Sequence, residues 1–315
     1  MKIVVLEKLA ISDDELREIA KPITDMGHEL VLHEKTDDIG KQKEYVKDAE
    51  ILVIGNMPLK GEVIRAAKNL RYIPVAFTGF DHVDLEACKE KGIKVSNASG
   101  YATINVAELV IGMMISLLRD IVPQDAKTRK GGLAQIGQDL TGKTVGVLGT
   151  GVIGVKTIEL LTAFNCEILG YDVVENDRAK ELGVKYMSMD DVLKQSDLVT
   201  IHTPLLESTK GMINKEKLEL MKPTAFLVNC ARGPIIDNDA LAEALENGVI
   251  AGAGIDVFDM EPPIPGDYPL MNAPNCIVTP HIGFFTKEAM IRRAHITFDE
   301  NIAGFLNGEQ KNVIL

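Results

Sequence analysis

Short apolar runs of strand length alternate with helix-like segments along the chain, in two successive series. The first series begins with "KIVVLE" at residue 2, and the second begins with "TVGVLG" at residue 144. Strands that alternate with helices form parallel sheets with helices on both faces. With 315 residues, the chain is long enough for two cores. The pattern therefore predicts an α/β protein with two doubly wound parallel-sheet domains.

The two series meet near "NASGYATINVAELVIGMMISLLRD". The part at 106–118 is apolar on nearly every face, which predicts a buried helix, packed either within one chain or against a second chain. The segment that begins at Met290 looks helical, ends at Gly308 and is expected to pack back on the first unit. We therefore expect a discontinuous domain made of residues 1–98 and 290–315, and a second domain of residues 99–289.

Composition and charge exclude several classes of protein. The net charge of −12 disfavours nucleic acid as a partner, because phosphate backbones are repelled. The longest apolar stretch, 106–118, is too short for a membrane span, and the apolar run before Glu7 is too short for a signal peptide. The four cysteines have no metal or disulfide spacing, and no metal site is predicted. We expect a cytoplasmic protein with free thiols.

A glycine pattern, G-x-G-x-x-G, lies between a predicted strand and a predicted helix. Gly149 permits a tight turn, Gly151 lets the backbone approach a pyrophosphate, and Gly154 lets the helix pack on the strand. The helix begins at Val152 and Ile153, where free N–H groups can bind an anion. Glycines match this pattern by chance in some proteins, as a turn without a ligand. Its position here predicts a Rossmann-type domain that binds a dinucleotide.

Asp172 ends the next apolar run, "EILGYD". A carboxylate at this position can accept hydrogen bonds from both ribose hydroxyls of an adenosine, and it repels a 2′-phosphate. No arginine follows directly. The predicted cofactor is therefore NAD and not NADP.

Polar side chains follow several strands of the second series, at the sheet edge where ligands bind. An arginine there can hold a carboxylate through a two-pronged pair, and a histidine can exchange a proton near neutral pH. A neighbouring glutamate would favour the imidazolium and orient it. Each could also be an ordinary surface or structural residue, and His202, which we read as a cofactor-side or structural group, is the rival histidine. The side chains at this edge are Arg232, Asp256, Glu261, His281, His202, Thr203 and Pro204.

Together these groups predict reduction of a 2-keto acid. Hydride from the nicotinamide would attack the carbonyl carbon, His281 would protonate the oxygen, and Arg232 would hold the carboxylate. His281 and Arg232 would thus both contact the substrate.

At this point the sequence resembles the D-isomer-specific 2-hydroxyacid dehydrogenases over nearly its whole length. The resemblance is carried by "GTGVIG" with Asp172, "MKPTAFLVNCARGPIID", "GIDVFDMEPP" and "TPHIG". It implies that Arg232, Glu261 and His281 are the catalytic set. It also implies a flavodoxin-like substrate-binding domain, and a homodimer built through the 101–120 helix.

The resemblance further implies which residues contact the ligands. Backbone N–H groups around Thr78 and Gly79 would share the substrate carboxylate. The nicotinamide would be lined by Cys230, Ala231, Asp256 and Gly283, and the adenosine side by Thr203, Pro204 and Thr209.

The substrate is less closely defined. The turn "NMPLKG" at 56–61 has Asn56 and Met57 but no arginine, which counts against a phosphorylated substrate. Glyoxylate, hydroxypyruvate or a pyruvate-like acid is expected. Phe284 and Phe285 stand where relatives often have smaller residues, and they either shape the substrate pocket or pack on the partner chain. The alternatives are an NAD-sensing binding protein of the corepressor type and a formate dehydrogenase on the same scaffold.

Overall fold

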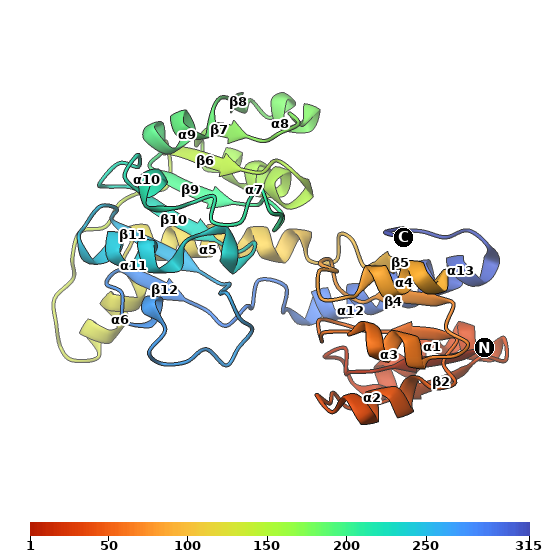
Figure 1. Ribbon diagram of the computed structural model, residues 1–315. Helices are drawn as coiled ribbons and strands as arrows, with labels where there is room; N and C mark the ends of the chain where they lie inside the picture. The colour runs from red at the N-terminus through yellow and green to blue at the C-terminus, as the bar shows by residue number, and fades with distance from the viewer. The chain divides into compact units, whose positions relative to one another are not determined.

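The computed structural model describes all 315 residues. It divides into two compact units, one of Met1–Ala102 with Phe285–Leu315 and one of Thr103–Phe284. The expected boundaries, 98/99 and 289/290, lie a few residues from these. Both units are α/β with wholly parallel sheets, which confirms the predicted fold class (Figure 1).

The first unit has a five-stranded sheet in the order β2-β1-β3-β4-β5, the flavodoxin-like order. Its strands are fully apolar in the middle of the sheet because helices cover both faces. The strands are β1 (Lys2–Val5), β2 (Glu29–Leu32), β3 (Ile51–Val53), β4 (Tyr72–Val75) and β5 (Lys94–Asn97). The helices are α1 (Asp13–Asp25), α2 (Ile39–Val46), α3 (Gly61–Ala66), α4 (Leu85–Lys91), α12 (Lys287–His295), a π-helix (Ile296–Ile302) and α13 (Ala303–Asn307).

Helix α1 illustrates how the sequence builds this unit. Ser12 caps its first turn by accepting a hydrogen bond from the N–H of Glu15. Leu16, Ala20 and Ile23 recur at helical spacing and are buried against the sheet. The helix therefore forms with one apolar stripe on the core.

The last helical segment returns to the first unit, as predicted. Ala294, Phe298 and Ile302 follow each other at four-residue spacing and join the core of β1, β3 and β4. The chain then runs antiparallel to β5: the N–H of Val95 donates to the carbonyl of Leu315, and the N–H of Asn97 donates to that of Asn312. The final residues thus cover the open edge of the sheet.

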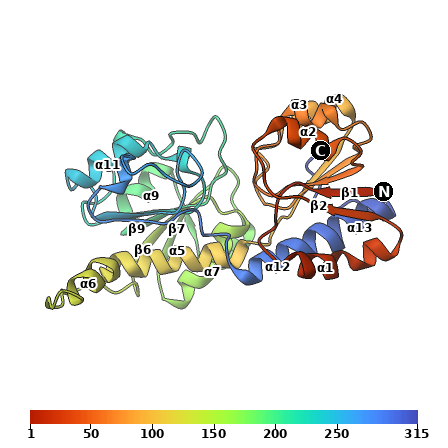
Figure 2. The same ribbon diagram turned by 90° about the horizontal axis from the view of Figure 1, so that it is seen from below.

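The second unit has a seven-stranded sheet in the order β12-β11-β10-β9-β6-β7-β8. Helices α5 and α7 lie together on one face, and α9 and α11 on the other (Figure 2). The strands are β6 (Thr144–Leu148), β7 (Glu167–Tyr171), β8 (Lys185–Tyr186), β9 (Leu198–Ile201), β10 (Phe226–Asn229), β11 (Gly252–Ile255) and β12 (Cys276–Val278). The helices are α5 (Thr103–Leu118), α6 (Ile121–Thr128), α7 (Val152–Ala163), α8 (Asp177–Glu181), α9 (Met189–Gln195), α10 (Lys215–Leu218) and α11 (Asn238–Glu246), with 3-10 turns at Gly233–Ile235 and Pro269–Met271.

Helix α5 is apolar on most faces because its own unit surrounds it. It packs against α7, β10 and β11, and Val110, Met114 and Leu118 are among its buried side chains. Of the two explanations that the sequence left open for this helix, packing within the chain accounts for most of its apolar surface. None of the helices is both long enough and apolar enough to cross a membrane. All four cysteines are free thiols.

Candidate active site

Three neighbouring strands of the second unit end in register. Asn229 at the end of β10 pairs with Ile255 of β11, and Ile255 pairs with Val278 of β12. Arg232, Asp256 and His281 follow these ends within three residues. The structure therefore brings the residues after these strands to one edge of the sheet (Figure 1).

His281 lies in a loop that Asp256 holds in place. The fully buried carboxylate of Asp256 accepts hydrogen bonds from the Thr279 hydroxyl (2.6 Å) and from the N–H groups of Ile282 and Gly283 (both 2.8 Å). His281 itself has φ of +56°, a left-handed conformation that costs free energy for a side chain of this size. The hydrogen bonds to Asp256 offset this cost, so the loop has one defined shape.

Burial and hydrogen bonding have opposite effects on the pKa of the Asp256 carboxyl. Burial raises the pKa of its carboxyl above the usual value, while the three hydrogen bonds and His281 oppose that rise. Oδ1 accepts two hydrogen bonds and Oδ2 accepts one. The observed role of Asp256 is therefore support of the loop, and a direct contact with nicotinamide would have to use the remaining acceptor position of Oδ2.

Glu261 and His281 form a pair, as predicted from the convergence of their strands at one edge of the sheet. Nδ1 of His281 lies 2.9 Å from Oε2 and 3.1 Å from Oε1 of Glu261. The imidazole is largely buried, and the carboxylate is 61% exposed. The Phe284 ring meets the imidazole edge to face, with centroids 5.1 Å apart. Nδ1 therefore points to the glutamate, and a proton exchanged with a ligand would pass through Nε2.

Arg232 is held by a residue that sequence reasoning missed. The buried side chain of Asn229 donates to the Arg232 carbonyl (3.0 Å) and accepts from the N–H of Ala231 (2.9 Å). Nη1 of Arg232 donates to the Ala231 carbonyl (2.8 Å). At Gly233 a Cβ would collide with the backbone of Phe258, so only glycine lets the chain turn here. A polar residue at the end of an apolar strand was the signal for Asn229.

The glycine loop has the features that a dinucleotide requires. Gly149 has φ of +98°, and a Cβ there would lie 2.7 Å from the backbone of His202. A Cβ at Gly151 would meet no atom within 4 Å, and no side chain caps the N-terminus of α7. The hydroxyl of Thr203 is buried without a hydrogen-bond partner. Free N–H donors, open space at Gly151 and an unpaired hydroxyl fit a pyrophosphate.

Asp172 lies at the end of β7, beside this loop. Its Oδ2 accepts from the N–H of Thr150 (2.6 Å) and from the Thr150 hydroxyl (3.2 Å). Its Oδ1 accepts from the N–H of Val173 (2.7 Å). The carboxylate is thus fixed next to the turn that would hold the pyrophosphate.

The remaining predicted cofactor residues have varied surroundings. Cys230 is buried, its thiol points to the sulfur of Met113 at 3.7 Å, and burial raises its pKa well above the usual value. The Thr209 hydroxyl donates to the Pro204 carbonyl (2.6 Å) and so shapes its own turn.

His202 contacts Thr200 through Nε2 (3.1 Å), and burial lowers its pKa to about 4. Its strand, β9, lies between β6 and β10 in the sheet. A neutral histidine fits the structural reading of this residue.

Thr78 and Gly79 belong to the first unit and lie in the loop after β4. Nδ2 of Asn97 donates to the Thr78 carbonyl (2.7 Å), which fixes this loop from β5. Glu7, after β1, accepts from the N–H groups of Gly55 and Met57 (both 2.8 Å). The carboxyl ends of β1, β3 and β4 therefore hold ordered loops.

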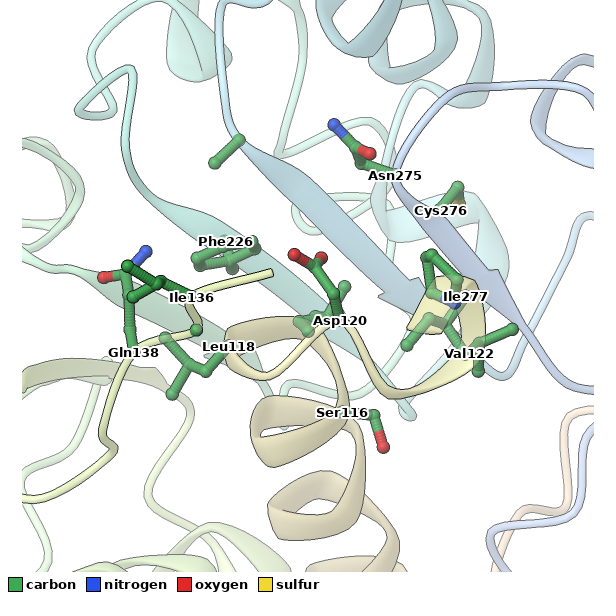
Figure 3. A pocket seen from close by; sticks show the side chains of 14 residues that line it. Ser116, Leu118, Asp120, Val122, Ile136, Gln138, Phe226, Asn275, Cys276 and Ile277 are labelled. Carbon is green, nitrogen blue, oxygen red and sulfur yellow. The ribbon is translucent and has the colours of Figure 1, made fainter. Parts of the chain in front are cut away.

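A cavity of about 320 Å³ lies at the opposite edge of the second sheet (Figure 3). It is bordered by Phe226, Asn275 and Cys276 at the amino ends of β10 and β12, and by Asp120 and Ile136. It is therefore separate from the edge that carries Arg232 and His281. No group of three or more His, Cys, Asp or Glu side chains is placed to hold a metal ion.

Residues 111–283 match the model of the NAD binding domain of the D-isomer specific 2-hydroxyacid dehydrogenases. A glyoxylate reductase of Thermofilum pendens is 37% identical over 89% of this chain and 86% of that protein. A glycerate dehydrogenase of Methylorubrum extorquens is 36% identical over 99% of this chain and 98% of its own. A D-lactate dehydrogenase of Aquifex aeolicus, solved with NAD and lactic acid, superimposes with a TM-score of 0.85 at 29% identity, covering 98% of this chain and 96% of that one.

The chain therefore belongs to the D-isomer specific 2-hydroxyacid dehydrogenase family. It is an NAD-dependent oxidoreductase, and the predictions of family, enzyme class and cofactor are confirmed.

Proposed function

We propose that the enzyme reduces a small, unphosphorylated 2-keto acid, such as glyoxylate, hydroxypyruvate or a pyruvate-like acid, with His281 as general acid. The observation that carries this proposal is the pair between Nδ1 of His281 and Glu261, 2.9 Å apart. A carboxylate on Nδ1 fixes the orientation of the imidazole, so that Nε2 would carry the exchanged proton. When bound, NADH supplies the hydride. In the reverse direction, a neutral His281 accepts the proton of the hydroxyl.

Arg232 is proposed to hold the substrate carboxylate through its planar guanidinium. The N–H groups of Thr78 and Gly79 are proposed to share that carboxylate. The loop that carries them is fixed by Asn97, which supports their use as prearranged donors.

Glu7 supports an unphosphorylated substrate. The backbone N–H groups of Gly55 and Met57 form a turn that could bind an anion, but both donate to the Glu7 carboxylate. A phosphate would meet a negative charge in place of these donors. The names of the glyoxylate reductase and the glycerate dehydrogenase fit this class of substrate, whereas a relative named D-3-phosphoglycerate dehydrogenase, 40% identical, makes the phosphorylated acid the alternative to test.

The cofactor is proposed to lie along the carboxyl edge of the second sheet. Thr203 carries the unpaired hydroxyl beside the glycine loop, and Asp172 would receive the ribose hydroxyls. The proposed contacts are Gly149, Gly151, Val152, Ile153, Gly154, Asp172, Thr203, Pro204 and Thr209 for the pyrophosphate and adenosine, and Cys230, Ala231, Asp256 and Gly283 for the nicotinamide.

The experiment that tests this function is NADH oxidation against glyoxylate, hydroxypyruvate, pyruvate, phenylpyruvate, 2-ketoisocaproate and 3-phosphohydroxypyruvate, with formate oxidation in parallel. We expect the small unphosphorylated acids to be turned over best. Retained turnover of the best acid, within a few fold, in both His281→Ala and Arg232→Ala would contradict the assigned site.

A homodimer is also proposed, built through the 101–120 helix, and the segment that follows this helix carries exposed apolar side chains that support it. Ile136 is 100% exposed and Leu133 is 84% exposed, and Val122 is also exposed nearby. Exposed apolar groups of this kind mark contact surfaces. Light scattering should give twice the chain mass, and Leu133→Asp with Ile136→Asp should give monomers. Met26→Asp, an exposed apolar position of the first unit, is the control.

A further inference from the structure

A line of three hydrogen bonds runs from the N–H of Asn176, through Tyr186 in the edge strand β8 and Thr150, to the carboxylate of Asp172. The N–H of Asn176 donates to the Tyr186 hydroxyl (2.9 Å), and this hydroxyl donates to Oγ1 of Thr150 (2.7 Å). The Thr150 hydroxyl in turn donates to Oδ2 of Asp172 (3.2 Å). Since each hydroxyl has one proton, every proton in this line is directed toward Asp172.

Packing fixes the Tyr186 ring, whose hydroxyl lies in this line. Tyr186 pairs with Gly170 across β7 and β8, and a Cβ at Gly170 would lie 3.3 Å from the Tyr186 ring and closer still to Val184. The absent side chain at position 170 therefore leaves room for the ring to lie over β7. Thr150, at the other end, is 1% exposed. Neither hydroxyl can move without breaking a hydrogen bond.

The line determines how Asp172 presents its oxygens. Oδ2 accepts two hydrogen bonds from Thr150, so Oδ1 is the oxygen to which a ribose hydroxyl would donate. Oδ1 accepts one from Val173 at 2.7 Å, and the N–H of Val174 lies at the outer limit of 3.5 Å. The protons of Thr150 and Tyr186 are both committed, so neither hydroxyl can donate to a phosphate.

We propose that Tyr186 is a positioning residue for cofactor selection: through Thr150 it holds the Asp172 carboxylate in the orientation that binds ribose hydroxyls and rejects a 2′-phosphate. The inference rests on the proposed contact between Asp172 and the adenosine ribose. It concerns the choice between NADH and NADPH and not the proton transfer at His281.

The test measures the dissociation constants of NADH and NADPH by calorimetry for the wild type, Tyr186→Phe, Thr150→Val, the double variant and Asp172→Ala. Tyr186→Phe keeps the ring and removes the hydroxyl. We expect this substitution to raise the dissociation constant of NADH about three- to tenfold, the effect of one hydrogen bond. The dissociation constant of NADPH should stay the same or fall. The kcat at saturating NADH should not change. Tyr45→Phe, in the first unit, is the matched control.

Coupling gives the second readout. If Tyr186 acts through Thr150, Tyr186→Phe should add almost nothing in the Thr150→Val background. Equal weakening of NADH and NADPH, or additive effects of the two substitutions, would overturn the inference and indicate a merely structural tyrosine. If Asp172→Ala binds NADH as tightly as the wild type, the proposed contact between Asp172 and the ribose is wrong. If Asp172→Ala binds NADH more weakly but Tyr186→Phe does not, only the role of Tyr186 is wrong.

Discussion

Nδ1 of His281 lies 2.9 Å from the carboxylate of Glu261, and the backbone of His281 has the left-handed φ of +56°. The two facts belong together, because the unusual backbone conformation turns the imidazole toward the glutamate. A loop with ordinary φ values would direct this side chain elsewhere. The pair thus depends on the hydrogen bonds that Asp256 makes beneath it.

Replacement of Glu261 tests the pair. In Glu261→Gln the imidazolium loses its charged partner, so we expect kcat for the best keto acid to fall by part of the roughly 10²- to 10⁴-fold that general acid catalysis contributes. His281→Ala should lose the whole contribution of general acid catalysis to kcat. Steady-state kinetics give both values, with Glu219→Gln, an exposed position, as the control. Unchanged kcat in Glu261→Gln would remove the glutamate from the mechanism.

Arg232→Lys tests the two-pronged contact with the substrate. Lysine keeps the charge but cannot form the planar fork, so we expect a higher KM and a lower kcat. The combined loss in kcat/KM should be about 10- to 100-fold, as for one hydrogen bond to a charged group. NADH affinity should stay constant. Arg119→Lys, another exposed position of the second unit, should behave as wild type.

Two glycines of the loop should respond differently to alanine. At Gly151 a methyl meets no protein atom, so the free energy of unfolding should change by less than about 0.5 kcal/mol. NADH should nevertheless bind about tenfold more weakly, since the methyl occupies the approach of the pyrophosphate. At Gly154 the methyl would collide with the Gly149 carbonyl, and a loss of about 1–3 kcal/mol is expected. Urea unfolding and NADH titration separate the two effects, and equal destabilisation would contradict the assignment.

Asp256→Asn tests the support of the histidine loop. An amide has one acceptor oxygen, and its NH₂ group would face the N–H of Ile282 or Gly283, so a buried donor loses its acceptor. We expect a loss of stability of about 1–3 kcal/mol together with reduced kcat. Asp139→Asn, an exposed carboxylate, is the control in urea unfolding. A variant with wild-type stability would show that the loop does not depend on this carboxylate.

His202 should make stability depend on pH. Its pKa is lowered to about 4 in the folded protein, against about 6.5 in the unfolded chain. The unfolded state therefore binds more protons between these values, and stability falls as the pH drops through this window. At pH 5 the loss from this group is about 2 kcal/mol relative to pH 7. Urea unfolding of wild type and His202→Gln at both pH values measures it, and an identical pH dependence in the two proteins would exclude the effect.

The long apolar strands and the glycine loop could be predicted because each has a pattern within a few consecutive residues. Strands β5 and β8 could not, because "KVSN" and "KY" are short, partly polar and acquire strand structure only by pairing with β4 and β7.

In the candidate site too, residues with a local sequence pattern could be predicted, and residues that depend on tertiary contacts could not. Arg232, Glu261 and His281 could be selected because each follows a strand. Asn229 and the line from Tyr186 to Asp172 could not, since they depend on which side chains meet across the fold. The sequence shows that a polar side chain lies in an apolar run, but its hydrogen-bond partner becomes known only from the tertiary structure.

The antiparallel pairing of residues 312–315 with β5 has a consequence for how the protein behaves in solution. Without that short segment, the backbone N–H and C=O groups on the outer side of β5 would be unpaired. An exposed edge strand of this kind can pair with strands of other molecules and so lead to aggregation. Proteolytic loss of the last few residues should therefore turn a well-behaved preparation into one that precipitates on storage.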